Sequence, residues 1–361
     1  MTEIYFPPGT YIFSRPLTID KRVNIYGNPV SFTAAERIRT VFDFSRMENS
    51  SGAAVYGLTT GYFTMVKDIT FVADAYEFAE DRVNFLINRD NGCFTSTVKR
   101  ANIGALNIGD YGTARDLYFW GFSDLAIKCE DYSMIKDVSI RQCRNGISLG
   151  TDNTVDNVRV VYGETAILTM GGENTVSNIR ADSLSGNAIT IRGGLNKLTG
   201  ILCDWVWKNA VTIIDGKGNN VDMAAGRCGI RGFSINPATV PGWFTDTTQA
   251  VVTLYGSTSG NLIRMSNYRS DLSDDNQGKW LFTPCIAISN DTGKALSQNN
   301  SFDLTIGDIN VVPNMDTNLM RRFLLLPVGD QSVSGGMICN GRYVTFSEAN
   351  RDNYTTAFTI L

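Results

Sequence analysis

Short apolar alternations recur along the chain and are most regular between Met134 and Ile213. Each row of this repeat carries two of them. The first alternations are Val138/Ile140, Val158/Val160, Ile179/Ala181 and Ile201/Cys203, and the second are Ile147/Leu149, Leu168/Met170, Ile189/Ile191 and Val211/Ile213. Alternation with a period of two indicates a strand with one buried face. We therefore expect two short strands per row, with these residues facing the core.

The rows end at evenly spaced asparagines, Asn153, Asn174, Asn196 and Asn219. A row of roughly 22 residues cannot bury its apolar face alone, so the rows must stack with parallel strands. Stacked amides can donate and accept hydrogen bonds from row to row. The alternative is that Asn and Gly only serve turns, because they tolerate left-handed backbone. Either way, the pattern predicts an all-β fold, a right-handed single-stranded parallel β-helix.

We expect this solenoid to cover residues 1–310, most regularly at 114–235, with insertions at 72–92 and 236–280. Residues 73–84 read as a short helix or loop, and 94–113 as one irregular row. Asn261 and Asn300 follow at steps near two rows each, so the solenoid continues with insertions. Since a solenoid has open ends that need cover, residues 311–361 are predicted to form a β-rich capping or oligomerisation segment.

Composition narrows the class of protein. The net charge is −4, and no basic tail suggests nucleic-acid binding. The first eight residues lack the features of a signal peptide, and no apolar run approaches the length of a membrane helix. We expect synthesis in a cytoplasm without a signal peptide, and no membrane insertion. Seven scattered cysteines without CxxC spacing predict free, buried thiols.

The chain contains no histidine. This excludes Ser-His-Asp and Cys-His nucleophile systems, histidine bases and histidine metal sites. Catalysis would rest on carboxylates, Lys, Arg or Tyr. Asp182 and Asp204 could also hold Ca²⁺, but no tight acidic cluster demands it. We predict no metal and no cofactor.

Positions just after the first strand of successive rows form an outward ladder: Trp120, Arg141, Val161, Asp182 and Asp204. Asp182 and Asp204 are one row apart, and Glu164 follows the preceding row. Paired carboxylates cleave glycosidic bonds, while aromatic rings and arginines bind sugars. The predicted catalytic residues are Asp182, Asp204 and Glu164. The predicted substrate contacts are Arg141, Arg159, Arg180, Tyr118, Trp120, Tyr162, Trp205 and Trp207. The alternative is a surface ion network.

A second outward ladder, Lys128, Ser148, Thr169, Thr190 and Thr212, carries mostly small hydroxyl groups. Such a ladder is typical of a solvated sheet face.

Two motifs carry a resemblance to a known family. The first is a P-x-G-x-Y turn, Pro7 to Tyr11, followed by short strands that end at Gly27. The second is a strand signature with copies at Lys67-Asp68-Ile69, Arg115-Asp116-Leu117 and Lys136-Asp137-Val138, and divergent copies at Asp156-Asn157-Val158 and Ser177-Asn178-Ile179. Over residues 4–235 the chain resembles pectate-lyase-like right-handed parallel β-helices, especially phage tailspikes and capsule depolymerases.

The resemblance implies a homotrimer in a virion tail that contacts other tail proteins and attaches to a host by binding a bacterial surface polysaccharide. It further implies cleavage by an endo-acting glycoside hydrolase. Two alternatives stay open. One is a lyase on an acidic polysaccharide, with Arg159 and Arg180 more important than the aspartates. The other is a non-enzymatic structural or receptor-binding β-helix.

Overall fold

The computed structural model describes residues 2–28, 39–80, 94–228, 250–269, 286–289, 297–306, 324–325, 333–339 and 342–346, and these contain strands and no helix. The chain divides into two compact units. The first comprises Met1–Asp81 and Phe94–Ala181, and the second Arg82–Cys93 and Asp182–Leu361. Each unit is a stack of parallel coils, which confirms the predicted right-handed parallel β-helix.

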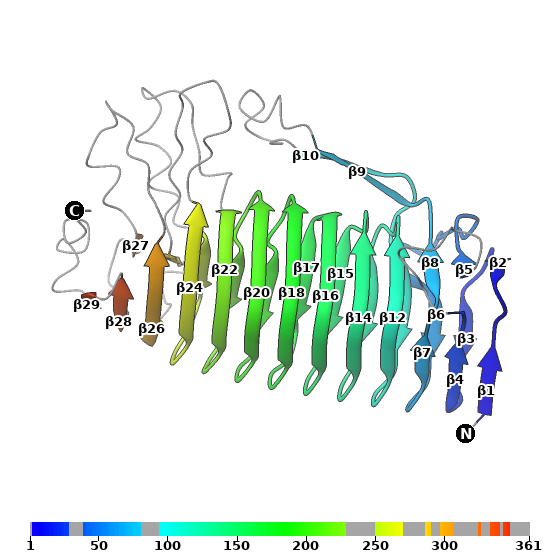
Figure 1. Cartoon of the computed structure of the whole chain (residues 1–361), viewed down its shortest axis with the longest axis horizontal. Helices are drawn as coiled ribbons and strands as arrows, with labels where there is room; N and C mark the ends of the chain where they lie inside the picture. Colours follow the sequence, from blue (N-terminus) through cyan, green and yellow to red (C-terminus); the bar gives the residue numbers. More distant parts are fainter. Residues whose placement is uncertain are drawn as a thin grey trace. The chain divides into compact units, whose positions relative to one another are not determined.

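The first unit opens with coils of three short strands. They are β1 (Thr2–Tyr5), β2 (Gly9–Ile12) and β3 (Leu17–Ile19), then β4 (Val23–Tyr26), β5 (Thr40–Asp43) and β6 (Val55–Thr60), then β7 (Met65–Lys67), β8 (Thr70–Val72) and β11 (Ile103–Ile108). Later coils have one long and one short strand. The long strands are β12 (Thr113–Trp120), β14 (Met134–Arg141), β16 (Thr154–Gly163) and β18 (Thr175–Leu184), whose last three residues belong to the second unit. The short strands are β13 (Leu125–Cys129), β15 (Asn145–Leu149) and β17 (Thr165–Thr169). Figure 1 shows β4, β7, β12, β14 and β16 side by side.

The long strands are bent, and the strand signature encodes the bend. β12 pairs with β7 through Thr113–Arg115 and with β8 through Tyr118–Trp120. Between these segments Asp116 has φ 54°. The second signature residue is left-handed in every copy, with φ of 54–59° at Asp68, Asp116, Asp137, Asn157 and Asn178. Asp and Asn tolerate this backbone better than other side-chain-bearing residues, which explains the composition of the signature.

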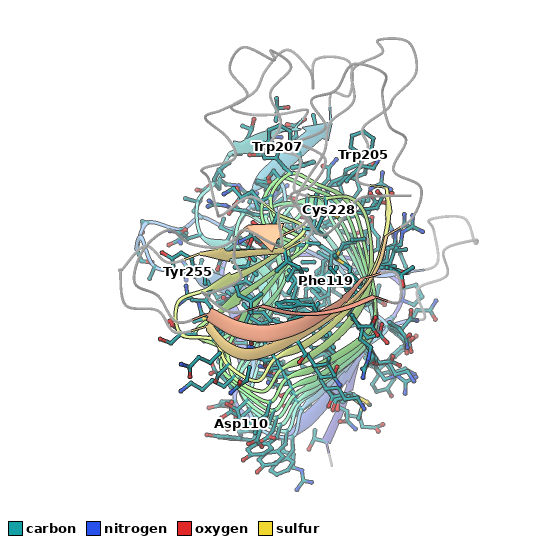
Figure 2. All side chains as sticks on the ribbon, turned by 90° about the vertical axis from the view of Figure 1, so that its left-hand side faces the viewer. Asp110, Phe119, Trp205, Trp207, Cys228 and Tyr255 are labelled. Carbon is teal, nitrogen blue, oxygen red and sulfur yellow. The ribbon has the colours of Figure 1, made fainter. Side chains whose placement is uncertain are left out.

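The core of the first unit lies inside the coils. The first alternations point inward as predicted, since Val138, Ile140, Val158 and Val160 are all buried. Phe42, Phe71 and Phe119 form an aromatic column, with ring centroids 5.6 and 5.0 Å apart. Phe119 lies inside the coil, whereas Asp110 lies at an outer edge (Figure 2).

The second unit continues the two-strand coil. One set of strands is β20 (Lys197–Val206), β22 (Asn220–Cys228), β24 (Leu262–Arg269), β26 (Ser297–Ile306) and β28 (Val333–Cys339); the other is β19 (Ile189–Arg192), β21 (Val211–Ile214), β23 (Val252–Tyr255), β25 (Ile286–Ser289) and β27 (Leu324–Leu325). Parallel pairing extends past residue 310 to β28, and β29 (Arg342–Phe346) closes this sheet antiparallel to β28.

The predicted asparagine stack is confirmed in both units. In the first, Asn153 donates its backbone N–H and its Nδ2 to Asn174 Oδ1, at 2.9 and 3.1 Å. In the second, Asn196 donates to Asn219, Asn219 to Asn261, and Asn261 to Asn300, with Nδ2 to Oδ1 distances of 2.8–2.9 Å. These direct bonds correct the spacing prediction. The long steps to Asn261 and Asn300 are one coil each, with inserted residues, and not two rows each.

The predicted helix or loop at 73–84 is wrong where it is described. Tyr76–Glu80 forms strand β9, which pairs antiparallel with β10 (Phe94–Val98). Residues 94–113 are likewise not one irregular row, because β10 belongs to this hairpin and β11 is a regular coil strand. The apolar residues Tyr76, Phe78 and Ala79 are compatible with either a helix or a strand. The pairing strand that decides between them begins only at Phe94.

The inward residues of β17 are also shifted by one position. Thr169 is 0% exposed and Met170 is 55% exposed, so Leu168 and Met170 do not face the core as predicted. The cause is pairing, since β15 aligns Ile147 with Ile167 and Leu149 with Thr169. The hydroxyl ladder is therefore broken at Thr169. Of its other members, Lys128 is partly exposed, but Ser148, Thr190 and Thr212 are buried and not solvated.

Candidate functional site

The first unit gathers aromatic and cationic side chains at the ends of its long strands. Trp120 and Arg141 are register partners on β12 and β14. The Arg141 guanidinium lies 5.5 Å from the Trp120 ring centroid and 5.1 Å from that of Tyr162. Arg141 is exposed and both rings are partly exposed. Three of the predicted substrate contacts thus form one aromatic–cation–aromatic cluster.

The β9–β10 hairpin borders this cluster. The chain leaves the coil after β8 and forms this projecting hairpin (Figure 1), and β9 contacts β16. Its base is fixed where the backbone N–H groups of Ala75 and Tyr76 both donate to Gly121 O, at 2.9 and 3.0 Å. The Phe78 ring lies 6.1 Å from the Tyr162 ring. The hairpin therefore adds a third aromatic ring that the sequence did not place near the site.

Glu164 is paired with a residue that the sequence analysis missed. Arg144 Nε donates to Glu164 Oε2 at 3.0 Å, and the Glu164 backbone N–H donates to Arg144 O at 2.6 Å. Tyr76 lies beside this pair. Burial raises the pKa of Tyr76 well above its ordinary value, and the Glu164 carboxylate adds to the rise. Glu164 is thus an oriented carboxylate at the foot of the hairpin.

The remaining predicted contacts of the first unit lie on the outward sheet face. Register runs from Tyr118 through Ser139 to Arg159. Burial is the main cause of a raised pKa at Tyr118, and Arg141 opposes it. Arg159 and Arg180 are exposed.

Other cationic side chains on this sheet form ion pairs with carboxylates. Lys67 and Arg115 pair with the adjacent signature aspartates at 3.1 and 2.9 Å, and Lys136 pairs with Asp156 at 3.8 Å. Among the described residues, Arg141 and Arg159 form no ion pair.

The second unit holds the two candidate catalytic aspartates, both partly exposed. Asp182 Oδ1 accepts a hydrogen bond from Ser183 Oγ, and Asp204 Oδ1 accepts one from the Trp205 backbone N–H, each at 3.0 Å. Asp204 faces Gly226 in register, and a Cβ at Gly226 would lie 3.1 Å from Asp204 Oδ1. A glycine here therefore leaves room beside the carboxylate.

Trp205 and Trp207, labelled in Figure 2, are only 3% and 6% exposed. Neither ring offers the open face that stacking on a sugar requires, so these two predicted contacts are not part of the exposed cluster. In the described ranges, no three His, Cys, Asp or Glu side chains come close enough to hold a metal ion. No helix in these ranges is long and apolar enough to cross a membrane.

Sequence patterns could have found part of what was missed. Tyr76 and Phe78 flank the polar Glu77, and residues 94–98 are mostly Phe, Thr and Val, which are residue types that favour strands. Arg144 gives no local signal, because its partner Glu164 lies one coil later.

Comparisons with known proteins agree with the fold. Residues 2–168 match the family model "Rhamnogalacturonase A/epimerase, pectate lyase-like". A search of curated protein sequences found no match. The enzymatically active domain of tailspike protein 2 from bacteriophage CBA120 superposes with TM-score 0.58 at 10% identity, over 93% of this chain and 50% of that one. The chain thus spans half the length of that tailspike domain.

Two further solved structures are similar. One is the catalytic domain of a GH87 α-1,3-glucanase in complex with tetrasaccharides, with TM-score 0.54 at 12% identity, over 91% of this chain and 64% of that one. The other is DFA-IIIase from Arthrobacter chlorophenolicus, with TM-score 0.51 at 12% identity, over 94% of this chain and 85% of that one. The fold is therefore a right-handed parallel β-helix that is similar to those of pectate-lyase-like proteins and phage tailspikes.

Proposed function

We propose that the chain is a tailspike-like protein that binds a bacterial surface polysaccharide and cleaves it as an endo-acting glycoside hydrolase. The observation that carries the proposal is the cluster of Trp120, Arg141 and Tyr162. Partly exposed rings offer apolar faces for sugar rings, and the guanidinium between them offers donors for sugar oxygens. The similar solved structures include a tailspike enzymatic domain and a glucanase bound to tetrasaccharides, which supports a glycan as the ligand.

The placement of one chain insertion in the first unit supports the same surface. In the first unit, the chain between β8 and β11 covers 73–102, whereas the chain between β12 and β13 covers only 121–124. Both segments follow the long-strand sheet at the turn next to Trp120, and the longer one carries the β9–β10 hairpin. An insertion at one turn of a rigid scaffold is typical of a binding site.

Asp182 and Asp204 would serve as general acid and as base or nucleophile, with Glu164 assisting. Hydrolysis needs one carboxyl group to protonate the leaving oxygen and another to activate water or attack the sugar. Both aspartates are partly exposed, and each accepts a hydrogen bond on Oδ1, which orients it. Arg159, Arg180 and Tyr118 would extend the contacts along the outward face.

The test is polysaccharide cleavage on a panel of capsular and O-antigen polysaccharides, measured as new reducing ends and as ultraviolet absorbance of unsaturated sugars. We expect reducing ends without absorbance. Asp182→Asn and Asp204→Asn should each lose roughly a hundredfold or more, the usual contribution of acid–base groups. Asp222→Asn, at an exposed strand position of the same unit, is the matched control and should keep full activity.

Each other result has a distinct meaning. Full activity in both variants would move the catalytic site elsewhere. Absorbance would favour a lyase, for which the exposed Arg159 without an ion pair among the described residues is the supporting observation. Binding without cleavage would leave a receptor-binding β-helix.

The proposal includes the assembly. A tailspike-like role implies a homotrimer in a virion tail that contacts other tail proteins. Light scattering coupled to size exclusion should then give three times the chain mass of 39.7 kDa. A monomer under all conditions would contradict this part alone.

A further inference from the structure

The β9–β10 hairpin buries one aromatic ring against the candidate site. Phe78 is 3% exposed although it belongs to an element that projects from the coil. Its ring centroid lies 6.1 Å from that of Tyr162 and 6.5 Å from that of Tyr76. Tyr162 in turn is one of the two rings against Arg141. Phe78, Tyr162, Arg141 and Trp120 therefore form a continuous row of contacts from the hairpin to the coil.

The backbone at Tyr162 is that of the repeating turn. Its φ is 64°, and the equivalent residues of the repeat, Gly121, Gln142, Ser183 and Trp205, are left-handed too, with φ of 51–80°. The turn therefore accepts residues other than tyrosine. What distinguishes Tyr162 is its ring, which lies against both Phe78 and Arg141.

We propose that Phe78 is a positioning residue for glycan binding, which holds Tyr162 against Arg141 and so completes the aromatic wall of the site. The inference rests on the proposed function, because it assigns a role to the hairpin within that same site. Phe78 is too buried to be the sugar platform itself, so it acts through Tyr162. The hairpin then sets affinity for the glycan, and the carboxylates carry out the chemistry.

The expected loss of glycan affinity follows from the free energy that an aromatic pair contributes. Such a pair contributes about 0.5–1.5 kcal/mol, so Phe78→Ala should weaken glycan binding by roughly two- to tenfold. The rate at saturating glycan should change by less than about twofold, since Phe78 does not touch the reacting bond. Phe78→Tyr keeps the ring contact and should restore binding to near the wild-type value.

The test is a double-mutant cycle between Phe78 and Tyr162. Dissociation constants are measured with labelled oligosaccharides prepared from the panel polysaccharide that the wild type binds. If Phe78 acts through Tyr162, then Phe78→Ala in a Tyr162→Ala background costs little further affinity. Val98→Ala, at an exposed position on the same hairpin, is the control and should bind like the wild type.

The outcomes separate this inference from the function on which it rests. Independent, additive effects of the two substitutions would overturn it, and so would unchanged binding by Phe78→Ala. Weak binding by Phe78→Tyr despite a wild-type melting temperature would also overturn it. A wild type that binds no polysaccharide on the panel would overturn the proposed function, and this inference with it.

Discussion

At the scale of single residues, buried asparagines connect one coil to the next. Asn219 Oδ1 accepts two hydrogen bonds from Asn196, and Asn219 Nδ2 donates to Asn261 Oδ1 and Gly193 O. These groups lie where water cannot replace a lost partner, since Asn196, Asn219 and Asn261 are all buried. A short polar side chain is used here because it can reach its own turn and the next coil together.

Asn219→Ala should therefore be strongly destabilising. It removes the acceptor of two Asn196 donors, and it leaves Asn261 Oδ1 with the residue 219 backbone N–H but without the Nδ2 donor. Each unsatisfied buried group costs about 1–3 kcal/mol, for a total of roughly 2–5 kcal/mol. Urea unfolding followed by circular dichroism measures this loss. Thr154→Ala, at an exposed strand end, is the control and should change stability by under about 0.5 kcal/mol. Equal stability of the two variants would contradict the role of the stack.

The buried cysteines give a second prediction at this scale. Cys129, Cys143, Cys203 and Cys228 are free and buried, as the sequence predicted. Burial raises the pKa of Cys143 and of Cys203 to about 12. Since the thiolate is the reactive form, these four thiols should resist alkylation at neutral pH in the native protein and react in denaturant. Mass spectrometry of iodoacetamide adducts identifies each site. Native labelling of Cys203 would contradict its burial.

The same shifts set a pH dependence of stability. A thiol whose folded pKa is raised keeps its proton in the folded state, while the unfolded state begins to ionise near its ordinary pKa. The contribution is fully present below that unfolded value and is lost as pH rises toward the folded one. The free energy of unfolding should thus fall as pH increases from about 9 toward 12.

At the scale of the element, the bent long strand is the repeating part. Its left-handed residue lets one strand serve two faces of the coil, as β12 does when it pairs with both β7 and β8. Asp137 occupies this position in β14, with φ 55°, and accepts a hydrogen bond from Asn157 Nδ2. The bend thus couples neighbouring coils through side chains as well as through the backbone.

Substitution at Asp137 should separate backbone strain from side-chain contacts. Asp137→Val places a β-branched residue in the left-handed region and should cost about 1–2 kcal/mol more than Asp137→Gly, which adopts that region freely. Both variants lose the same hydrogen bond, so that bond does not enter the difference between them. Equal unfolding midpoints would show that the bend tolerates any residue.

At the scale of the whole molecule, every coil depends on residues contributed by the next. Register partners in the coil strands are separated in the sequence by a whole coil, as with Val138 and Val158. Such non-local pairing must close a chain loop before each contact forms, which slows folding. Refolding from urea should take on the order of seconds or longer, with interrupted-unfolding experiments to remove proline phases. A millisecond main phase would contradict the expectation.

The repeating pattern of the sequence was sufficient to predict the coil, the asparagine stack, the signature and the inward face of most strands. These features repeat with one period, so each coil predicts its neighbours. Residues such as Val138 and Val158 could be placed without knowing any distant contact. The pairing of Trp120 with Arg141 was predicted in the same way, by counting equivalent positions in successive rows.

Features that do not repeat with the coil could be assigned only from the three-dimensional contacts. Pairing with β15 shifted Thr169 inward, direct bonds between asparagines showed that each long step is one coil, and a hairpin placed Phe78 on Tyr162. The contact between Arg144 and Glu164 likewise joins residues on successive coils. Each of these depends on side chains that meet across a turn or an insertion. At these positions the local sequence pattern contains no information about the partner, which is determined by packing and hydrogen bonding.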